Sequence, residues 1–152
     1  MPTLAYNKFQ VFVEHLANKV HDLFGSGANA DTLKVYLSNT APDAATHQVK
    51  ADLAEITAGN GYPAGGVALP NQSGTRSGGT FSLTADQITI TASGGSIGPF
   101  RYFVLYNDTP TSPADPLIAW WDYGSALTLQ DGDSITLRFN GQQTGGTVMT
   151  IS

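Results

Sequence analysis

Apolar and polar residues alternate along most of the chain from residue 31 onward. The segments 31–38, 79–84 and 88–92 carry apolar side chains at every second position. Because successive side chains of a β-strand point to opposite faces, this period predicts strands with one buried face. The segment 100–107 is apolar on both faces and is therefore expected to be a central strand. Strand patterns also occupy 117–123, 127–130, 133–139 and 147–152.

The first of these strands has the clearest division between its faces. Leu33, Val35 and Leu37 fall on one face of residues 31–38, and Lys34 and Tyr36 fall on the other. The first face is expected to lie in the core, and the second to be the unburied face of the sheet.

Turn-forming residues separate the predicted strands. Asp131–Gly132 stands where a two-residue type I′ hairpin would join the flanking strands, and Asn140–Gly141 predicts a second turn. The proline-rich segment 107–116 is expected to be an exposed loop. The Gly-rich segment 57–79 predicts a long loop with one short strand at 67–69, and such loops are often functional. Residues 49–56 are expected to form a short helix or an irregular connection.

The N-terminal 25 residues have a helical period instead. A helix would gather one set of apolar residues on a single side, with Gly25 as its C-terminal cap; these residues are Phe9, Val13, Leu16, Val20 and Leu23. The competing interpretation is a strand at FQVFV, residues 9–13. An amphipathic helix here would either cover an open face of the strands or dock on a neighbouring subunit.

Seven to nine short strands without helical spacers favour a mainly β fold. We expect an antiparallel two-sheet β-sandwich of jelly-roll or Greek-key kind, preceded by the N-terminal amphipathic helix. A chain of 152 residues corresponds to one domain, and no internal boundary or repeat divides it. The prediction is a single domain over 1–152, with 1–25 as a helix or arm.

Composition and charge restrict the function. A net charge of −5 and the absence of a basic patch with interleaved aromatic residues argue against nucleic-acid binding. The chain has no cysteine, which excludes disulfides, thiolate zinc sites and cysteine nucleophiles. No apolar run approaches the roughly 20 residues that span a bilayer, and the first residues lack the basic segment and apolar core of a secretion signal. We therefore expect a protein that is made in the cytoplasm and has no membrane partner. All four lysines lie in the first third, which suggests that this third faces something different from the rest of the chain.

One catalytic motif occurs, the G-x-S-x-G pattern at Gly94–Gly98. The serine hydrolase mechanism needs its serine on a turn between a strand and a helix. Pro99 and a strand follow Ser96, so a glycine-rich turn explains the motif, and the chain is not expected to be an enzyme.

The histidines and acidic residues do not form a recognisable metal site. His15, His21 and His47 lack zinc-chelating spacing and are expected to face solvent or a partner. A turn explains Asp131-Gly132-Asp133 better than a calcium loop, and Asp108, Asp115 and Asp122 could converge only through the fold. The segment GNGYPAGG at 59–66 misses the dinucleotide-binding spacing. We therefore expect no catalytic, cofactor-binding or metal-binding residues and no cofactor.

Trp120 and Trp121 are consecutive, so a strand would place them on opposite faces. One is expected in the core and the other under the helix or in an interface. A sugar-stacking platform is the alternative use of these side chains.

Five segments of the chain resemble a family of small virion proteins of tailed bacteriophages: NKFQVFVEHLANKVHDL (7–23), DTLKVYLSNTAP (31–42), ADLAEITAGNGY (51–62), GGSIGPFRYFVLYNDT (94–109) and DPLIAWWDYG (115–124). The similarity is one of overall texture over Asn7–Tyr62 and Gly94–Asp133. The segment 24–30 is longer here than in the family pattern.

This resemblance implies a capsid decoration or cement protein on the virion surface that binds the major capsid protein and forms a dimer or trimer. It transfers no catalytic residue. The alternative is a tail or fibre protein that recognises a host-surface glycan through Trp120 or Trp121.

Overall fold

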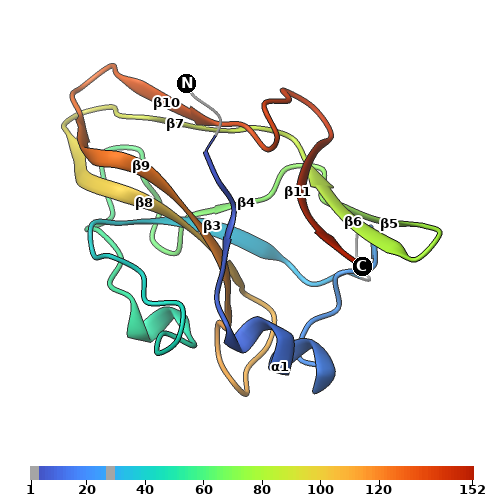
Figure 1. Ribbon diagram of the computed structural model, residues 1–152. Helices are drawn as coiled ribbons and strands as arrows, with labels where there is room; N and C mark the ends of the chain where they lie inside the picture. The colour runs from blue at the N-terminus through green and yellow to red at the C-terminus, as the bar shows by residue number, and fades with distance from the viewer. Residues whose placement is uncertain (1–3, 27–29) are drawn as a thin grey trace.

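The computed structural model describes residues 4–26 and 30–152, and it is mainly β with antiparallel pairing throughout (Figure 1). This confirms the predicted fold class at that level. The strands form three sheets rather than the two expected, so the two-sheet arrangement is not confirmed.

The largest sheet has five strands in the order β1-β9-β8-β3-β4. Its strands are β1 (Asn7–Lys8), β9 (Leu117–Leu129), β8 (Ile97–Asn107), β3 (Leu33–Ser38) and β4 (Val67–Ala68). The four-stranded sheet has the order β11 (Gly146–Ile151), β6 (Thr80–Ala85), β5 (Ser73–Ser77) and β2 (Gly25–Ser26). The two-stranded sheet pairs β10 (Ser134–Leu137) with β7 (Ile88–Thr91).

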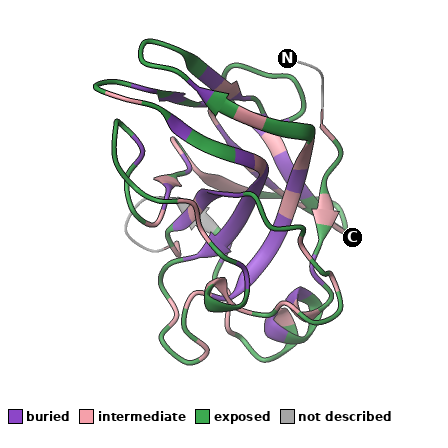
Figure 2. Cartoon of the chain, turned by 90° about the vertical axis from the view of Figure 1, so that its left-hand side faces the viewer, coloured by how far each residue is buried: buried purple, intermediate pink, exposed green. Residues whose placement is uncertain are grey.

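Strand β8 is the centre of the largest sheet, as its apolar faces predicted. Val104 pairs with Trp120 of β9 on one side and with Tyr36 of β3 on the other. From Tyr102 to Asn107 every residue of β8 is buried. Figure 2 shows the buried residues concentrated on these long strands and the exposed ones on the loops and the hairpin ends.

Both faces of this sheet are covered. The main hydrophobic cluster takes side chains from all three sheets, including Leu33, Val35 and Leu37 of β3. A second cluster lies on the opposite face around Tyr36 and Tyr106. The prediction that Tyr36 belongs to an unburied face is therefore wrong, because other segments of the chain pack over it.

The expected hairpin at Asp131–Gly132 is not formed. β10 pairs with β7, not with β9. Residues 130–133 still form a turn, in which Asp133 N donates to Gln130 O over 2.8 Å, but the turn carries the chain from one sheet to the next. The turn forms where the sequence predicted one, but of its two central residues only Gly132 has a positive φ, so it is not type I′. Burial of Ile135 and Leu137 in the main cluster decides the strand partner.

The loop predicted at 57–79 contains more structure than expected. β4 agrees with the short strand expected at 67–69, but β5 adds a second strand at Ser73–Ser77. The side chains of β5 are small or polar, so its pairing with β6 rests on backbone hydrogen bonds that hydrophobic periodicity does not reveal. Residues 49–56 were expected to form a short helix or an irregular connection, and they contain a short 3₁₀ helix at Lys50–Asp52.

The N-terminal helix is shorter than predicted and buries a different face. α1 spans Val11–Ala17 and buries Phe12 and His15, whereas Val13 is 54% exposed. Part of the competing FQVFV strand thus lies in the helix. Residues 1–3 of the predicted helix, and residues 27–29 of the longer segment 24–30, lie outside the described residues.

α1 ends eight residues before Gly25, at a Schellman-type cap. Val20 N donates to His15 O over 2.9 Å and Lys19 N to Leu16 O over 3.2 Å. Lys19 takes the left-handed conformation, with φ 61°, that glycine usually supplies. The sequence did not predict this cap, because the residue in the left-handed conformation is a lysine and not the usual glycine. It turns the chain back on itself, so Val20 and Leu23 never join the face of α1.

Candidate interaction surface

Residues 4–24, here called the N-terminal cover, lie along the edge of the five-stranded sheet. β1 pairs Asn7 with Trp120 and Lys8 with Ala119. Phe9 is completely buried and packs on the Trp120 ring with 4.6 Å between ring centroids. The cover is thus anchored to β9 by a short strand and one aromatic side chain.

The largest apolar side chains left exposed in the described chain all belong to this cover. They are Tyr6, Val13 and Phe24, at 36%, 54% and 55% exposure. Phe24 lies beside Phe81 of β6, with 5.8 Å between ring centroids, at a hollow of about 430 Å³. Contiguous exposed apolar side chains are typical of a surface that contacts another protein, and this segment carries the large ones that could contribute to such a surface.

The two N-terminal histidines are not solvated, contrary to expectation. His15 is only 7% exposed and His21 is half-buried, with their ring centroids 5.8 Å apart. On one continuous helix, residues six positions apart would point in different directions, so the sequence predicted that the two histidines are separated. The cap at Lys19 ends the helix between them and folds His21 back beside His15.

A second covering segment, residues 49–66, is here called the loop cover, and Glu55 joins its parts to one another. One carboxylate oxygen of Glu55 accepts from Lys50 Nζ over 2.7 Å, and the other accepts from Tyr62 Oη over 2.7 Å and Gly65 N over 2.8 Å. Burial would raise the pKa of Glu55, but these hydrogen bonds together hold it below its ordinary value. We call these four residues the Glu55 network.

Tyrosines extend this network into β3 and β8. Tyr62 Oη also accepts from Leu37 N over 3.0 Å, and Tyr106 Oη donates to Gly65 O over 2.7 Å. Lys50 Nζ lies 4.9 Å from the centroid of the Tyr36 ring, within cation–π range. At Gly66 the backbone has φ 83° and a Cβ would collide with the carbonyl of Val35, so only glycine fits. The Gly-rich segment is therefore fixed to the sheet in its first part.

The three aspartates considered together do not converge. Asp122 forms a bidentate pair with Arg101, at 2.8 and 3.0 Å, which holds the pKa of Asp122 low. Asp108 pairs with Lys34 Nζ over 2.9 Å. Burial and the neighbouring Asp108 raise the pKa of Asp115. Asp108 and Asp115 therefore lie close together, and Asp108 and Asp122 are each held in an ion pair.

The other sequence candidates lie in turns. Ser96 is exposed immediately before β8, so a strand and not a helix follows it. Asp131 Oδ1 accepts from Gly94 N and Asp133 Oδ2 from Gln130 N, which accounts for both aspartates of the turn. His47 Nδ1 accepts from Asp43 N over 3.0 Å.

The tryptophans lie on opposite faces, as predicted. Trp121 is 5% exposed in the main cluster, where it contacts Phe139. Trp120 is partly exposed, but its ring packs on Phe9 of the N-terminal cover. Burial removes Trp121 from stacking on a sugar, and Phe9 occupies part of the Trp120 ring.

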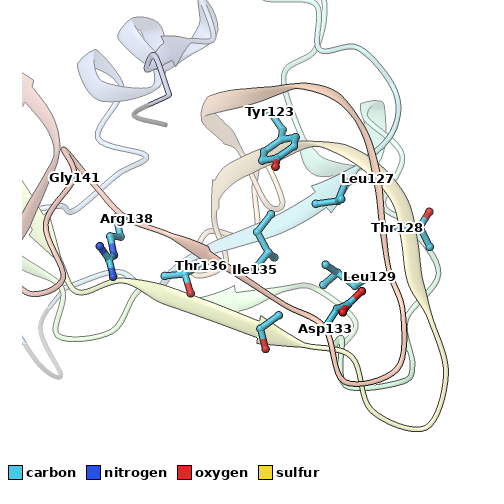
Figure 3. Close-up of a pocket in the computed structure, with 10 residues that line it drawn as sticks. Tyr123, Leu127, Thr128, Leu129, Asp133, Ile135, Thr136, Arg138 and Gly141 are labelled. Atoms are coloured by element: carbon cyan, nitrogen blue, oxygen red, sulfur yellow. The ribbon is translucent and has the colours of Figure 1, made fainter. Parts of the chain in front are cut away.

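A groove of about 710 Å³ separates the end of β9 from β10 (Figure 3). Tyr123 and Leu127 of β9 lie across it from Ile135 of β10, and Asp133 and Arg138 lie toward its ends. The groove combines an apolar floor with hydroxyl and charged rims and has no convergent acid–base set.

Within residues 4–26 and 30–152, no three His, Asp or Glu side chains gather in a way that could hold a metal ion. The described part of the chain also contains no helix with the length and apolarity needed to cross a membrane.

Comparison with known proteins adds no relative: no family model, no curated protein and no solved structure matches the chain.

Proposed function

We propose that this chain is a structural protein of a tailed-bacteriophage virion, a decoration or cement protein that binds the major capsid protein on the outside of the shell. The protein is made in the host cytoplasm and joins the virion as a dimer or trimer. Membranes and nucleic acid are not among its partners. The proposed fold is a β-sandwich, with the five- and four-stranded sheets as its two layers.

The observation that carries the proposal is the position of the exposed apolar side chains. Tyr6, Val13 and Phe24 all belong to the N-terminal cover, which also carries two of the four lysines. The resemblance to small phage virion proteins includes most of the same segment, residues 7–23. An apolar surface of this kind favours protein–protein contact, and binding summed over many copies makes a modest contact sufficient.

The chemistry of the remaining surface agrees with a binding role. Asp131, Asp133 and His47 accept backbone hydrogen bonds, and Ser96 lies in an exposed turn. The net charge of −5 disfavours attraction to packaged DNA. We therefore propose no enzymatic activity.

Glycan recognition by a tail or fibre protein is not favoured by the geometry. Its proposed platforms were Trp120 and Trp121, and the first packs on Phe9 while the second is buried. A glycan array that responds to Trp120→Ala would restore this alternative.

Counting and locating the protein in purified virions tests the proposal. We expect hundreds of copies per particle, density on the capsid shell, and heads that rupture more easily when the protein is removed. A handful of copies, or density in the neck or tail, would contradict it.

Variants then test the surface. Replacing Val13 and Phe24 together by Asp should abolish binding to stripped heads and leave the fold unchanged, because both side chains are more than half exposed. Ser125→Asp is the matched control, since Ser125 is an exposed position of β9 away from the cover. Equal binding of the two variants to stripped heads would show that the N-terminal cover does not contact the capsid.

A further inference from the structure

The side-chain amide of Asn107 has a determined orientation. Asn107 is completely buried at the end of β8, and its Oδ1 accepts from Thr109 N over 3.1 Å. Its Nδ2 donates to Asp31 Oδ2 over 2.7 Å and lies 3.0 Å from His21 Nδ1. Reversing the amide would turn Oδ1 toward the Asp31 carboxylate and leave Thr109 N facing a donor. The amide nitrogen therefore faces His21.

This orientation decides which proton His21 can hold. Since Asn107 Nδ2 only donates, His21 Nδ1 must accept, and the neutral ring carries its hydrogen on Nε2. Protonation of His21 would add a hydrogen to Nδ1 and place two donors against each other at 3.0 Å. The bond that joins the N-terminal cover to β8 therefore exists only while His21 is neutral.

The surroundings of His21 also disfavour its charged form. His15 of α1 faces it at 5.8 Å and Phe12 at 5.2 Å between ring centroids. Among the described residues, neither His15 Nδ1 nor His21 Nε2 has a hydrogen-bond partner, and both atoms are buried. Burial lowers the pKa of His21 to about 4, and His15 acts in the same direction.

Acidic groups near the pair oppose this effect only in part. Asp31, which precedes β3, favours the charged form of His21, and Glu14 favours that of His15. Asp31 Oδ2 already accepts from Asn107 and from Asp22 N. Asp22 and Lys19 line the adjoining hollow with opposite charges.

We propose that His21, with His15 beside it, is an acid-sensitive latch that holds residues 11–24 on the end of β8 and releases them when His21 takes up a proton. The sheet remains paired during release, because its backbone hydrogen bonds do not titrate. α1 has seven residues and no side-chain cap at its N-terminus, so it has little stability of its own once detached. The latch belongs to the isolated protein, whatever the chain binds.

Hydrogen exchange of the purified protein between pH 7 and pH 5 tests the latch. After correction for intrinsic exchange rates, amides of residues 11–24 should open about twentyfold more often at pH 5, as a shift of the histidine pKa from 6.5 to about 4 implies. Amides of β3 and β8 should keep their protection. An N-terminal cover equally protected at both pH values would overturn the proposal.

Two variants separate the latch from a general effect of acid. His21→Asn keeps an acceptor for Asn107 and cannot titrate, so the increase in opening should disappear. His47→Asn also removes a histidine that accepts a backbone hydrogen bond, but in another loop, and should leave the increase intact. An unchanged increase in His21→Asn would overturn the latch.

Titration of the imidazole signals by NMR in the unmodified protein decides the question if His21→Asn does not fold. We expect His21 to titrate well below pH 6.5, together with loss of protection in residues 11–24. Titration near 6.5 with the cover still protected would contradict the proposal.

Discussion

The N-terminal cover and the loop cover both pack on the five-stranded sheet, but different forces hold them. Each contributes to both hydrophobic clusters, through Phe9 and Phe12 in the first cover and through Leu53 and Tyr62 in the second. The loop cover adds the Glu55 network, in which one carboxylate accepts three hydrogen bonds. The N-terminal cover relies on aromatic packing and on a histidine that must remain neutral.

This difference indicates which of the two covers can detach from the sheet. Detaching the loop cover would break the hydrogen bonds that Tyr62 and Gly65 make with β3 and β8, and leaving a buried group such as Leu37 N without a partner is costly. Detaching residues 11–24 exposes apolar surface and allows two histidines to ionise, which becomes easier as the pH falls. The first part of the Gly-rich segment, residues 57–66, which the sequence indicated as a functional loop, thus belongs to the firmly held loop cover. The segment expected to be a helix is the one with an exposed apolar surface.

Among the tests of this difference between the two covers, Glu55→Ala should have the largest effect on stability. Lys50 and Tyr62 would lose their shared partner, and we expect the free energy of unfolding in urea to fall by about 2–3 kcal/mol, because hydrogen bonds to a charged group are lost at a part-buried site. Asp108→Ala is the matched control, since the Lys34–Asp108 pair is more exposed and should contribute less than about 1 kcal/mol. Equal losses in the two variants would mean that the network does not hold the loop cover.

Acid should weaken the N-terminal cover before it affects the loop cover. The unfolded chain binds a proton at His21 near pH 6.5 and the folded chain only near pH 4, so stability is lost as the pH falls through this window. Between pH 7 and pH 5 we expect a loss of about 2 kcal/mol in the free energy of unfolding. The Glu55 network should not contribute, because the lowered pKa of Glu55 keeps it ionised at pH 5. If the free energy of unfolding does not change between pH 7 and pH 5, the proposed difference between the two covers is wrong.

Tyr62→Phe isolates one hydroxyl of the loop cover. It removes the donor to Glu55 and the acceptor of Leu37 N, and we expect a loss of about 1–2 kcal/mol by thermal or urea unfolding. Tyr123→Phe, at the rim of the groove in Figure 3, should change stability by less than about 0.5 kcal/mol. If the two variants lose similar amounts of stability, the hydrogen bonds of the Tyr62 hydroxyl do not stabilise the protein.

Lys19→Gly should have the smallest effect and the opposite sign. Lysine is strained at φ 61°, so glycine should stabilise the end of α1 by about 0.5 kcal/mol and raise Tm by about 1–2 °C. Asn18→Gly, at φ −87°, is the control and should not stabilise the protein. A lower Tm for Lys19→Gly would mean that the lysine side chain has a role in the cover.

Much of the strand content could be predicted because it depends on neighbours in sequence. The alternation in 88–92 and the two apolar faces of 100–107 correspond to β7 and β8. β5 could not be predicted, because its small and polar side chains leave no periodic signal. The candidate surface was predicted only as a segment, since Val13 was assigned to the buried face and is the exposed one.

The sequence by itself determined where most strands and turns lie, because period-two patterns and turn residues act over a few positions. Only the tertiary structure decided that β10 pairs with β7, that His21 lies beside His15, and that Glu55 gathers Lys50, Tyr62 and Gly65. These arrangements depend on burial and on hydrogen bonds between residues distant in sequence, and on one lysine in a glycine-like conformation. Their energies arise from the packed fold, so no local pattern records them.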